Sequence, residues 1–177
     1  MQHKKQDIDQ VLLACKQGNR QAQLYIYKQY YRAMYNTAYR IVRDKQEAEN
    51  VMQEAFLAAF TKLNMFQGQS TFGAWLKRIV VNKSINSLRG KKEYVEIDDK
   101  KHDAPIESPI DEAQIKSKVK QTVDAISSLK DKYRIPLALN VLEGYDCIEI
   151  AEILGLTHQN TKTIVSRAKI KIRAMVK

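Results

Sequence analysis

Apolar and polar positions follow one another along most of the chain with the period of an α-helix. A short apolar stripe over residues 8–15 ends at Gly18-Asn19, and a longer one covers residues 20–42. Residues three and four positions apart share one face of a helix, so both stripes predict helices with one buried face. Six of the nine tyrosines fall within residues 25–39, where a tyrosine stripe is more typical of a core edge than of a stacking surface.

Two further helices are predicted in the first half of the chain. Asp44 is predicted to cap the third helix, with Glu47 as its capping-box partner. The segment 64–69, NMFQGQ, breaks the pattern, and Ser70 is the predicted N-cap of a helix over residues 71–89. The apolar residues of that helix are predicted to be core: Phe72, Trp75, Leu76 and Ile79.

The second half of the chain is predicted to be helical as well. Residues 111–127 have an amphipathic pattern, and another helix is predicted over residues 131–142, where Pro136 costs one backbone hydrogen bond or a bend. Gly144 ends that helix. In the helix predicted over residues 111–127, the apolar stripe that is expected to pack inward is Ile115, Val119, Val123 and Ile126. No β-type alternation extends beyond a few residues, so the predicted fold class is all-α.

Residues 146–171 have the pattern of a helix-turn-helix. Asp146 and Glu149 form a D-x-x-E capping box, Gly155 permits a tight turn, and Thr157 caps the second helix. Packing between the helices is predicted for Ile148, Ala151, Ile153 and Leu154, and for Ile164, Val165 and Ala168. The second helix of such a motif can enter a major groove of DNA.

Charge divides the 177-residue chain into three blocks. The formal net charge is +10, and residues 1–92 carry 16 basic and 6 acidic residues. Residues 93–112 carry 2 basic and 8 acidic residues, and residues 113–177 carry 12 basic and 6 acidic residues. The acidic block also contains two prolines, which predicts a flexible linker between two small helical domains. Its charge leads to the hypothesis that it lies over the basic faces when no ligand is bound.

The basic balance favours polyanionic partners, with nucleic acid first. No apolar run has the length of a membrane span, and the N-terminus lacks the apolar core of a signal peptide, which predicts an intracellular, cytoplasmic protein. The two cysteines and three histidines are scattered, so neither a metal site nor a cofactor is expected.

The second helix of the motif is basic, and no acidic residue follows Ile153. A solvated basic helix and a DNA-binding helix both fit, and the agreement of motif with charge favours DNA binding. The N-terminal part of such a helix points at base edges, which gives five candidate readers: His158, Gln159, Lys162, Thr163 and Ser166. Arg167 and Lys169 are predicted to contact phosphate.

Residues 55–92 contain no carboxylate, yet they hold seven basic residues, the only Trp and all four Phe. These aromatics are either core beside a solvated edge or part of a surface for nucleic acid. Composition alone does not decide between the two.

Three ordered segments resemble the sigma factors of bacterial RNA polymerase, in their small extracytoplasmic-function (ECF) group. They are DKQEAENVMQEAFLAAF (44–60), FQGQSTFGAWLKRIVVNKSINSLR (66–89) and EGYDCIEIAEILGLT…SRAK (143–169). The resemblance implies a promoter-specificity subunit that is not itself an enzyme. Residues 1–92 would bind core polymerase and open the minus-10 element, residues 93–112 would be the linker, and residues 113–177 would read the minus-35 element.

The resemblance also implies roles for single residues. In the family, the first segment docks on the largest subunit of the polymerase, and its pattern falls here on Asp44, Glu49, Asn50, Gln53 and Glu54. Asn50 stands where an acid is usual. From the residues alone, an ordinary solvated face also fits Gln53 and Glu54.

The loop of the second segment holds, in the family, a base flipped out of the minus-10 element. It is matched by Phe66, Gln67, Gly68 and Ser70. An aromatic ring, a glycine that allows close approach and small polar groups suit a base that has left its stack. Asn82 and Asn86 are predicted to form a buried, base-facing end, with Asn86 where the family commonly has an acid. Phosphate contacts are predicted for Lys77, Arg78, Lys83, Arg89, Lys91 and Lys92.

Two rival functions are open at this point. A stand-alone helix-turn-helix regulator does not explain the 44–60 helix or the FQGQS loop, and a DNA recombinase needs a nucleophile with clustered arginines that neither basic block has. The expected partners are core RNA polymerase, promoter DNA as duplex and as melted strand, and an anti-sigma factor of the kind the family usually has. No small-molecule substrate is expected.

Overall fold

The computed structural model describes residues 2–94 and 113–176, and side chains within 8–90 and 119–176. The described residues form α-helices joined by short turns and contain no strand, which confirms the predicted fold class. The chain divides into two compact units, Met1–Asp98 and Asp99–Lys177. Residues 95–112, all but the first two of the predicted linker 93–112, lie outside the described residues, and so does the hypothesis that this acidic block covers the basic faces.

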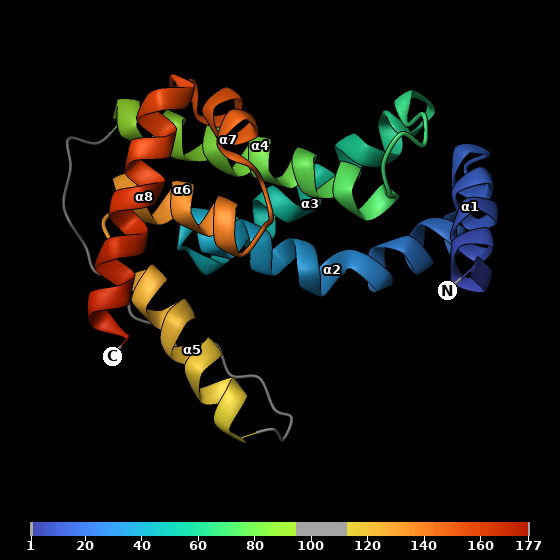
Figure 1. Cartoon of the computed structure of the whole chain (residues 1–177). Coiled ribbons are helices and arrows are strands. Elements are labelled where there is room, and N and C mark those ends of the chain that lie inside the picture. Colours follow the sequence, from blue (N-terminus) through green and yellow to red (C-terminus); the bar gives the residue numbers. More distant parts are fainter. Residues whose placement is uncertain (1, 95–112, 177) are drawn as a thin grey trace. The chain divides into compact units, whose positions relative to one another are not determined.

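The described part of the first unit is built from three long helices, one shorter helix and one 3-10 turn. These elements are α1 (Gln2–Lys16), α2 (Arg20–Val42), α3 (Lys45–Thr61), η1 (Leu63–Met65) and α4 (Phe72–Tyr94). In Figure 1, α2, α3 and α4 pack against one another, and α1 packs on α2. Their common core is formed by buried side chains, most of them from these three helices: Ile26, Ile41, Met52, Leu63, Leu76, Val80 and Val81.

Side-chain caps fix where these helices begin. Asp44 Oδ1 accepts a hydrogen bond from the Glu47 amide at 2.7 Å, so the predicted cap of α3 is confirmed. The predicted cap of α4 is wrong by one residue: Thr71 Oγ1, rather than Ser70, accepts from the Ala74 amide at 3.2 Å. Ser70 Oγ instead donates to the Thr71 carbonyl oxygen at 3.4 Å. Serine and threonine are both good N-caps, so the sequence did not distinguish these two neighbours.

The tyrosines of α2 form a ladder along one face of the helix. Tyr27, Tyr31, Tyr35 and Tyr39 follow one another at four-residue spacing, with neighbouring ring centroids 5.4, 6.3 and 6.2 Å apart. Tyr39 is buried, the other three are half-buried, and Tyr27 also lies 4.8 Å from the ring of Phe56 in α3. The stripe is therefore the edge of the core, as predicted.

The second unit contains α5 (Ala113–Ser128), α6 (Asp131–Val141), α7 (Cys147–Leu154) and α8 (His158–Met175). Its core cluster consists of residues from the end of α5, the turn that follows it, α6 and α8: Ile126, Leu129, Leu137, Ala138, Val165 and Ala168. Pro136 is buried inside α6, which continues through it. The prediction that Val119 packs inward is wrong, because the cluster takes up only the C-terminal end of α5 and leaves Val119 exposed.

The predicted helix-turn-helix is present as α7, a turn and α8. Asp146 Oδ1 accepts from the amides of Ile148 and Glu149 at 2.7 and 2.8 Å, and Glu149 Oε2 accepts from the Asp146 amide at 2.9 Å. Gly155 has φ +68°, which ends α7 in the left-handed conformation that glycine adopts without strain. Thr157 Oγ1 caps α8 through the Asn160 amide at 3.2 Å.

One packing position in α7 was predicted wrongly. Ile148 is exposed, and Ile150 is fully buried in its place. Ile150 shares a helix face with Cys147, which packs on the core cluster, and with Leu154, whereas Ile148 points away from that face. The predicted packing positions of α8 are confirmed, since Ile164, Val165 and Ala168 are buried.

Candidate functional site

The exposed face of α3 carries three of the residues predicted to bind polymerase. Asn50, Gln53 and Glu54 are exposed, while the opposite face of the helix is buried in the core. Two side-chain hydrogen bonds run along the exposed face, from Gln46 Nε2 to Asn50 Oδ1 and from Gln53 Nε2 to Glu49 Oε1, each 3.3 Å long. α3 therefore presents an ordered, polar surface that a protein partner can contact.

The other two residues of this predicted group, Asp44 and Glu49, interact with other parts of the first unit. Asp44 is exposed and caps α3. Glu49 is half-buried beside the tyrosine ladder. Partial burial, with the neighbouring tyrosines and the negative charge of Glu49, raises the pKa of Tyr27 and Tyr35 above the ordinary value. The structure thus separates an outward group on α3 from two residues that shape the helix.

Leu57 is a residue of this face that the sequence analysis missed. Its side chain is 70% exposed, and it lies three and four residues after Glu54 and Gln53, on the same side of α3. In a sequence, an apolar residue at helical spacing is normally assigned to the core. The one signal that Leu57 is exposed is its position seven residues after Asn50, which places it on the polar face of the helix. Single exposed apolar side chains are common on protein surfaces, so the interest of Leu57 lies in its place beside the residues predicted to bind polymerase.

The loop after η1 is lined by an aromatic cluster. The ring of Phe66 lies 5.8 Å from that of Phe72 and 5.4 Å from that of Trp75, and the latter two are 5.7 Å apart. Phe66 is half-buried as a result, whereas residues 67–70 are exposed. Gly68 has φ +72° with open space around its Cα, so the loop bends there in a conformation that favours glycine. Phe66 is thus part of a fixed wall at the base of the loop.

The exposed face of α4 continues from this wall. Trp75, Ile79, Asn82, Asn86 and Arg89 recur at the spacing of one helix face. The prediction of a buried amide end is wrong, because the side chains of Asn82 and Asn86 are both exposed. The core prediction holds for Phe72 and Leu76, which are buried, but Trp75 and Ile79 are only half-buried.

The predicted phosphate contacts have different surroundings. Arg78 and Arg89 are exposed, Lys77 and Lys83 are half-buried, and the side chains of Lys91 and Lys92 lie outside the described residues. Lys83 Nζ forms an ion pair with Glu54 Oε2 at 2.9 Å, with 32% and 66% of the two side chains exposed. A predicted DNA contact is therefore joined to a predicted polymerase contact. Exposed pairs of this kind contribute about 0–1 kcal/mol, so a stronger partner can displace either member.

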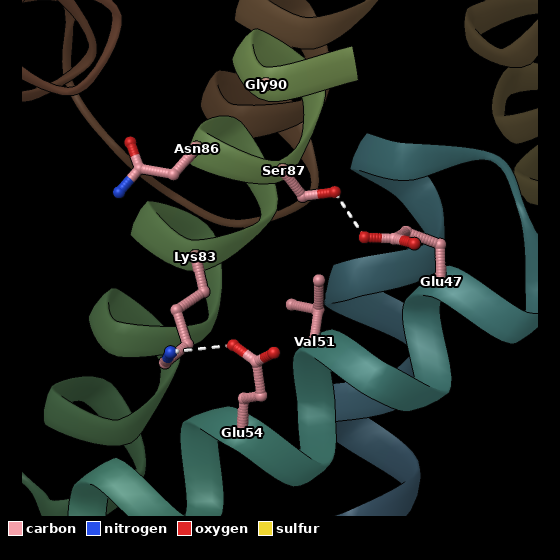
Figure 2. Close-up of a pocket in the computed structure, with 7 residues that line it drawn as sticks. All are labelled: Glu47, Val51, Glu54, Lys83, Asn86, Ser87 and Gly90. Atoms are coloured by element: carbon pink, nitrogen blue, oxygen red, sulfur yellow. Dashed lines mark hydrogen bonds and ion pairs between the residues drawn. The ribbon is translucent and has the colours of Figure 1, made fainter.

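This ion pair borders an open hollow of about 450 Å³ between α3 and α4. Figure 2 shows the two ties that cross it: the pair of Lys83 with Glu54, and a hydrogen bond from Ser87 Oγ to the Glu47 carboxylate. Val51 forms the apolar part of its lining, and Asn86 and Gly90 lie on the α4 side. Among the described residues, no group of His, Cys, Asp and Glu could hold a metal ion.

α8 places the predicted readers on its outer face. His158, Gln159, Lys162, Ser166, Arg167 and Lys169 are exposed, and Thr163 is half-buried. Thr163 Oγ1 already donates to the Gln159 carbonyl oxygen at 2.9 Å, so it can offer DNA only an acceptor. The face also includes Ile170, which is 62% exposed and which the sequence analysis did not single out.

Comparisons with known proteins agree with this arrangement. The family model for sigma-70 region 2 matches residues 26–94, and the model for sigma-70 region 4 matches residues 120–172. The RNA polymerase sigma-H factor of Pseudomonas aeruginosa is 31% identical over 179 residues, covering 93% of this chain and 91% of that protein. The ECF RNA polymerase sigma factor SigW of Bacillus subtilis is 29% identical over 173 residues, covering 92% of each.

Two solved structures share the fold. One is the sigma factor RpoE of Bartonella quintana in complex with the anti-sigma factor NepR, with a TM-score of 0.58, 20% identity, and coverage of 85% of this chain and 94% of that chain. The other is CnrH in complex with the cytosolic domain of CnrY, with a TM-score of 0.55, 21% identity, and coverage of 93% of each. No described helix is long and apolar enough to cross a membrane. With both family models matched in order and relatives aligned over nearly their whole length, the chain belongs to the sigma-70 family of RNA polymerase sigma factors, in its ECF group.

Proposed function

We propose that three surfaces of this chain divide the functions of a sigma factor, the subunit that directs core RNA polymerase to initiate transcription at a promoter. The outer face of α3 binds the polymerase, loop 66–70 with α4 holds the opened minus-10 strand, and α8 reads the minus-35 duplex. One observation carries the proposal. Every residue predicted for these roles whose side chain is described is at least partly exposed, although most apolar residues between them are buried.

On α3, the direct contacts are Asn50, Gln53, Glu54 and the exposed Leu57. Burying an exposed leucine side chain at an interface is favourable, and polar neighbours around it exclude water. Asp44 contributes by capping the helix, and Glu49 contributes by accepting a hydrogen bond from the side-chain amide of Gln53. Both residues therefore affect polymerase binding indirectly, because they fix the start of α3 and the position of the Gln53 side chain.

In the loop, the aromatic wall of Phe66 and Trp75 offers an apolar surface against which a base can stack. Base stacking on aromatic side chains contributes about 1–3 kcal/mol per base, which offsets part of the cost of unstacking. Gln67, Gly68 and Ser70 supply polar groups and close approach, and Asn82 and Asn86 supply amides on the adjoining face of α4. Lys77, Arg78 and Arg89 supply positive charge for phosphates, and Lys83 joins them once Glu54 releases it.

On α8, His158, Gln159, Lys162, Thr163 and Ser166 face base edges, and Arg167 and Lys169 contact phosphates. The polymerase supplies the chemistry, so the chain is not an enzyme, and it acts in the cytoplasm with the polymerase. An anti-sigma factor is a further proposed partner, because the RpoE structure that shares this fold was solved with one.

A transcription assay with core polymerase and a matched promoter tests the proposal. Phe66→Ala and Asn82→Ala should weaken promoter opening more than polymerase binding, because both residues are proposed to contact the base and neither belongs to the polymerase-binding face of α3. Gln53→Ala should do the reverse, with opening restored at high protein concentration. Equal loss of binding and opening in all three variants would overturn the division of surfaces. A stand-alone regulator would bind the promoter and yield no specific transcript.

A further inference from the structure

Met65 is an exposed apolar side chain at the edge of the base-holding loop. It is the last residue of η1, directly before Phe66, and 69% of it is exposed. Among the large apolar side chains of the described residues, only that of Leu57 is more exposed. Residues 55–92, which surround it in sequence, contain no acid.

The turn that presents Met65 is fixed on both sides. The Met65 amide donates to the Lys62 carbonyl oxygen at 2.9 Å, and the Phe66 amide donates to the Leu63 carbonyl oxygen at 3.1 Å. Leu63 is 2% exposed and anchors the turn in the core, and the Phe66 ring is held by Phe72 and Trp75. The backbone at Met65 is therefore rigid, while its unbranched side chain can adapt to what it meets.

The two aromatic rings nearest the loop are committed to the wall. Phe66 and Trp75 contact each other at 5.4 Å and each contacts Phe72, so neither can leave to enter a DNA duplex without breaking the cluster. A flipped base leaves a gap in its stack, and proteins that open or kink DNA often fill such a gap with Met, Leu, Ile or Phe. Beside this loop, Met65 is the exposed apolar side chain that is not already packed.

We propose that Met65 inserts at the base step next to the flipped minus-10 base and occupies the gap that the base leaves. The inference rests on the proposed function of the loop. Phe66 then binds the extruded base, and Met65 stabilises the strand from which it came. The two residues act on different steps: Phe66 binds the base after it has left the stack, and Met65 prevents the base from returning to the duplex.

The test uses holoenzyme assembled with core polymerase and promoters that carry 2-aminopurine in the minus-10 element. Met65→Ala should reduce the opening equilibrium on fully duplex promoter about tenfold, the effect of losing the burial of one large apolar side chain. On a promoter pre-melted at that step, the variant should bind like the original protein. Met65→Leu should retain opening, and Met65→Gln, which has similar length and is polar, should lose it like Met65→Ala.

The matched control is Leu13→Ala in α1, which truncates another exposed apolar residue and should leave opening unchanged. Equal opening by Met65→Ala and the original protein on duplex would overturn the inference, and so would equal behaviour of Met65→Gln and Met65→Leu. Phe66→Ala separates the two proposals, since it should lose binding on both templates. If Phe66→Ala has no effect on either, the loop does not hold a base and the proposed function fails, whatever Met65 does.

Discussion

Thr161 carries a hydroxyl that is buried without a hydrogen-bond partner. It lies in the first turns of α8, its residue exposure is 0%, and Oγ1 has no partner. A buried hydroxyl without a partner loses its hydrogen bonds to water and forms none inside the protein. The helix proposed to read DNA therefore contains a local source of instability on its inner side, opposite the proposed readers.

Thr161→Val should raise the free energy of unfolding by about 1 kcal/mol, because it keeps the shape of the side chain and removes the unsatisfied oxygen. Urea denaturation followed by circular dichroism measures this change. Thr161→Ser is the control, since it keeps the hydroxyl and removes the buried methyl group, so it should be less stable than the original protein. A valine variant less stable than the serine variant would mean that the hydroxyl is satisfied.

The exposure and ion pairing of some single residues were not predictable from the sequence. Leu57 follows helical spacing like a core residue, and Met65 lies in the segment that breaks the helical pattern, so the apolar periodicity marked neither as an exposed side chain. Lys83 looked like one more phosphate contact, because nothing in its neighbourhood along the chain indicates that Glu54, 29 residues earlier, lies 2.9 Å away. Exposure and ion pairing depend on which helices meet, which a period of about 3.6 residues does not encode.

At the scale of elements, α2 and α4 approach each other closely at Gly73. A Cβ built at this residue would lie 2.8 Å from Cε1 of Tyr30, whose ring packs edge-on against Phe72 at 5.5 Å. Phe72 in turn contacts Phe66 and Trp75. The glycine therefore sets the position of the aromatic wall as well as the packing of the two helices.

Gly73→Ala should lower the free energy of unfolding by about 1–3 kcal/mol, because the added methyl group overpacks the contact with Tyr30. Gly90→Ala in the same helix is the matched control. No atom lies within 4 Å of its added Cβ, so it should be stabilising by up to about 1 kcal/mol through helix propensity. The two variants should shift the denaturation midpoint in opposite directions, and shifts of the same sign would contradict the close approach.

Most elements were predictable, and their ends less so. Asp44, Asp146, Gly155 and Thr157 were assigned correctly, since each role requires a particular side chain or a left-handed backbone. The start of α4 was misassigned because Ser70 and Thr71 are chemically equivalent caps. Ile148 was misassigned because α7 is too short for periodicity alone to choose between its isoleucines.

At the scale of the whole molecule, the positive charge lies in the two helical units, and α8 contains no acidic residue. Each phosphate contact releases condensed counterions, so the number of contacts appears as the salt dependence of binding. The fold class and the family followed from periodicity and from three motifs in order. The surroundings of Asn82 and Asn86 did not, because both amides are exposed rather than buried.

Lys162→Ala or Arg167→Ala should weaken binding of the protein to a minus-35 duplex and make the slope of log K against log salt shallower by about 0.9 for each phosphate that is no longer neutralised. Fluorescence anisotropy at several salt concentrations measures the slope. Lys120→Ala removes the same charge from an exposed position on α5 and should leave the slope unchanged. An equal change in all three variants would show that net charge, rather than binding through α8, controls affinity.

Trp75 gives the protein a built-in optical reporter. It is the single tryptophan of the chain, and its indole is half-buried beside Phe66 and Phe72, at the wall on which a base is proposed to stack. Tryptophan emission changes when a neighbouring group displaces water from the ring or quenches its excited state. Selective excitation of this indole, in the free protein mixed with single-stranded minus-10 DNA, should therefore report loop occupancy without any label. Duplex minus-35 DNA, which is proposed to bind the other unit, should leave the emission as it was.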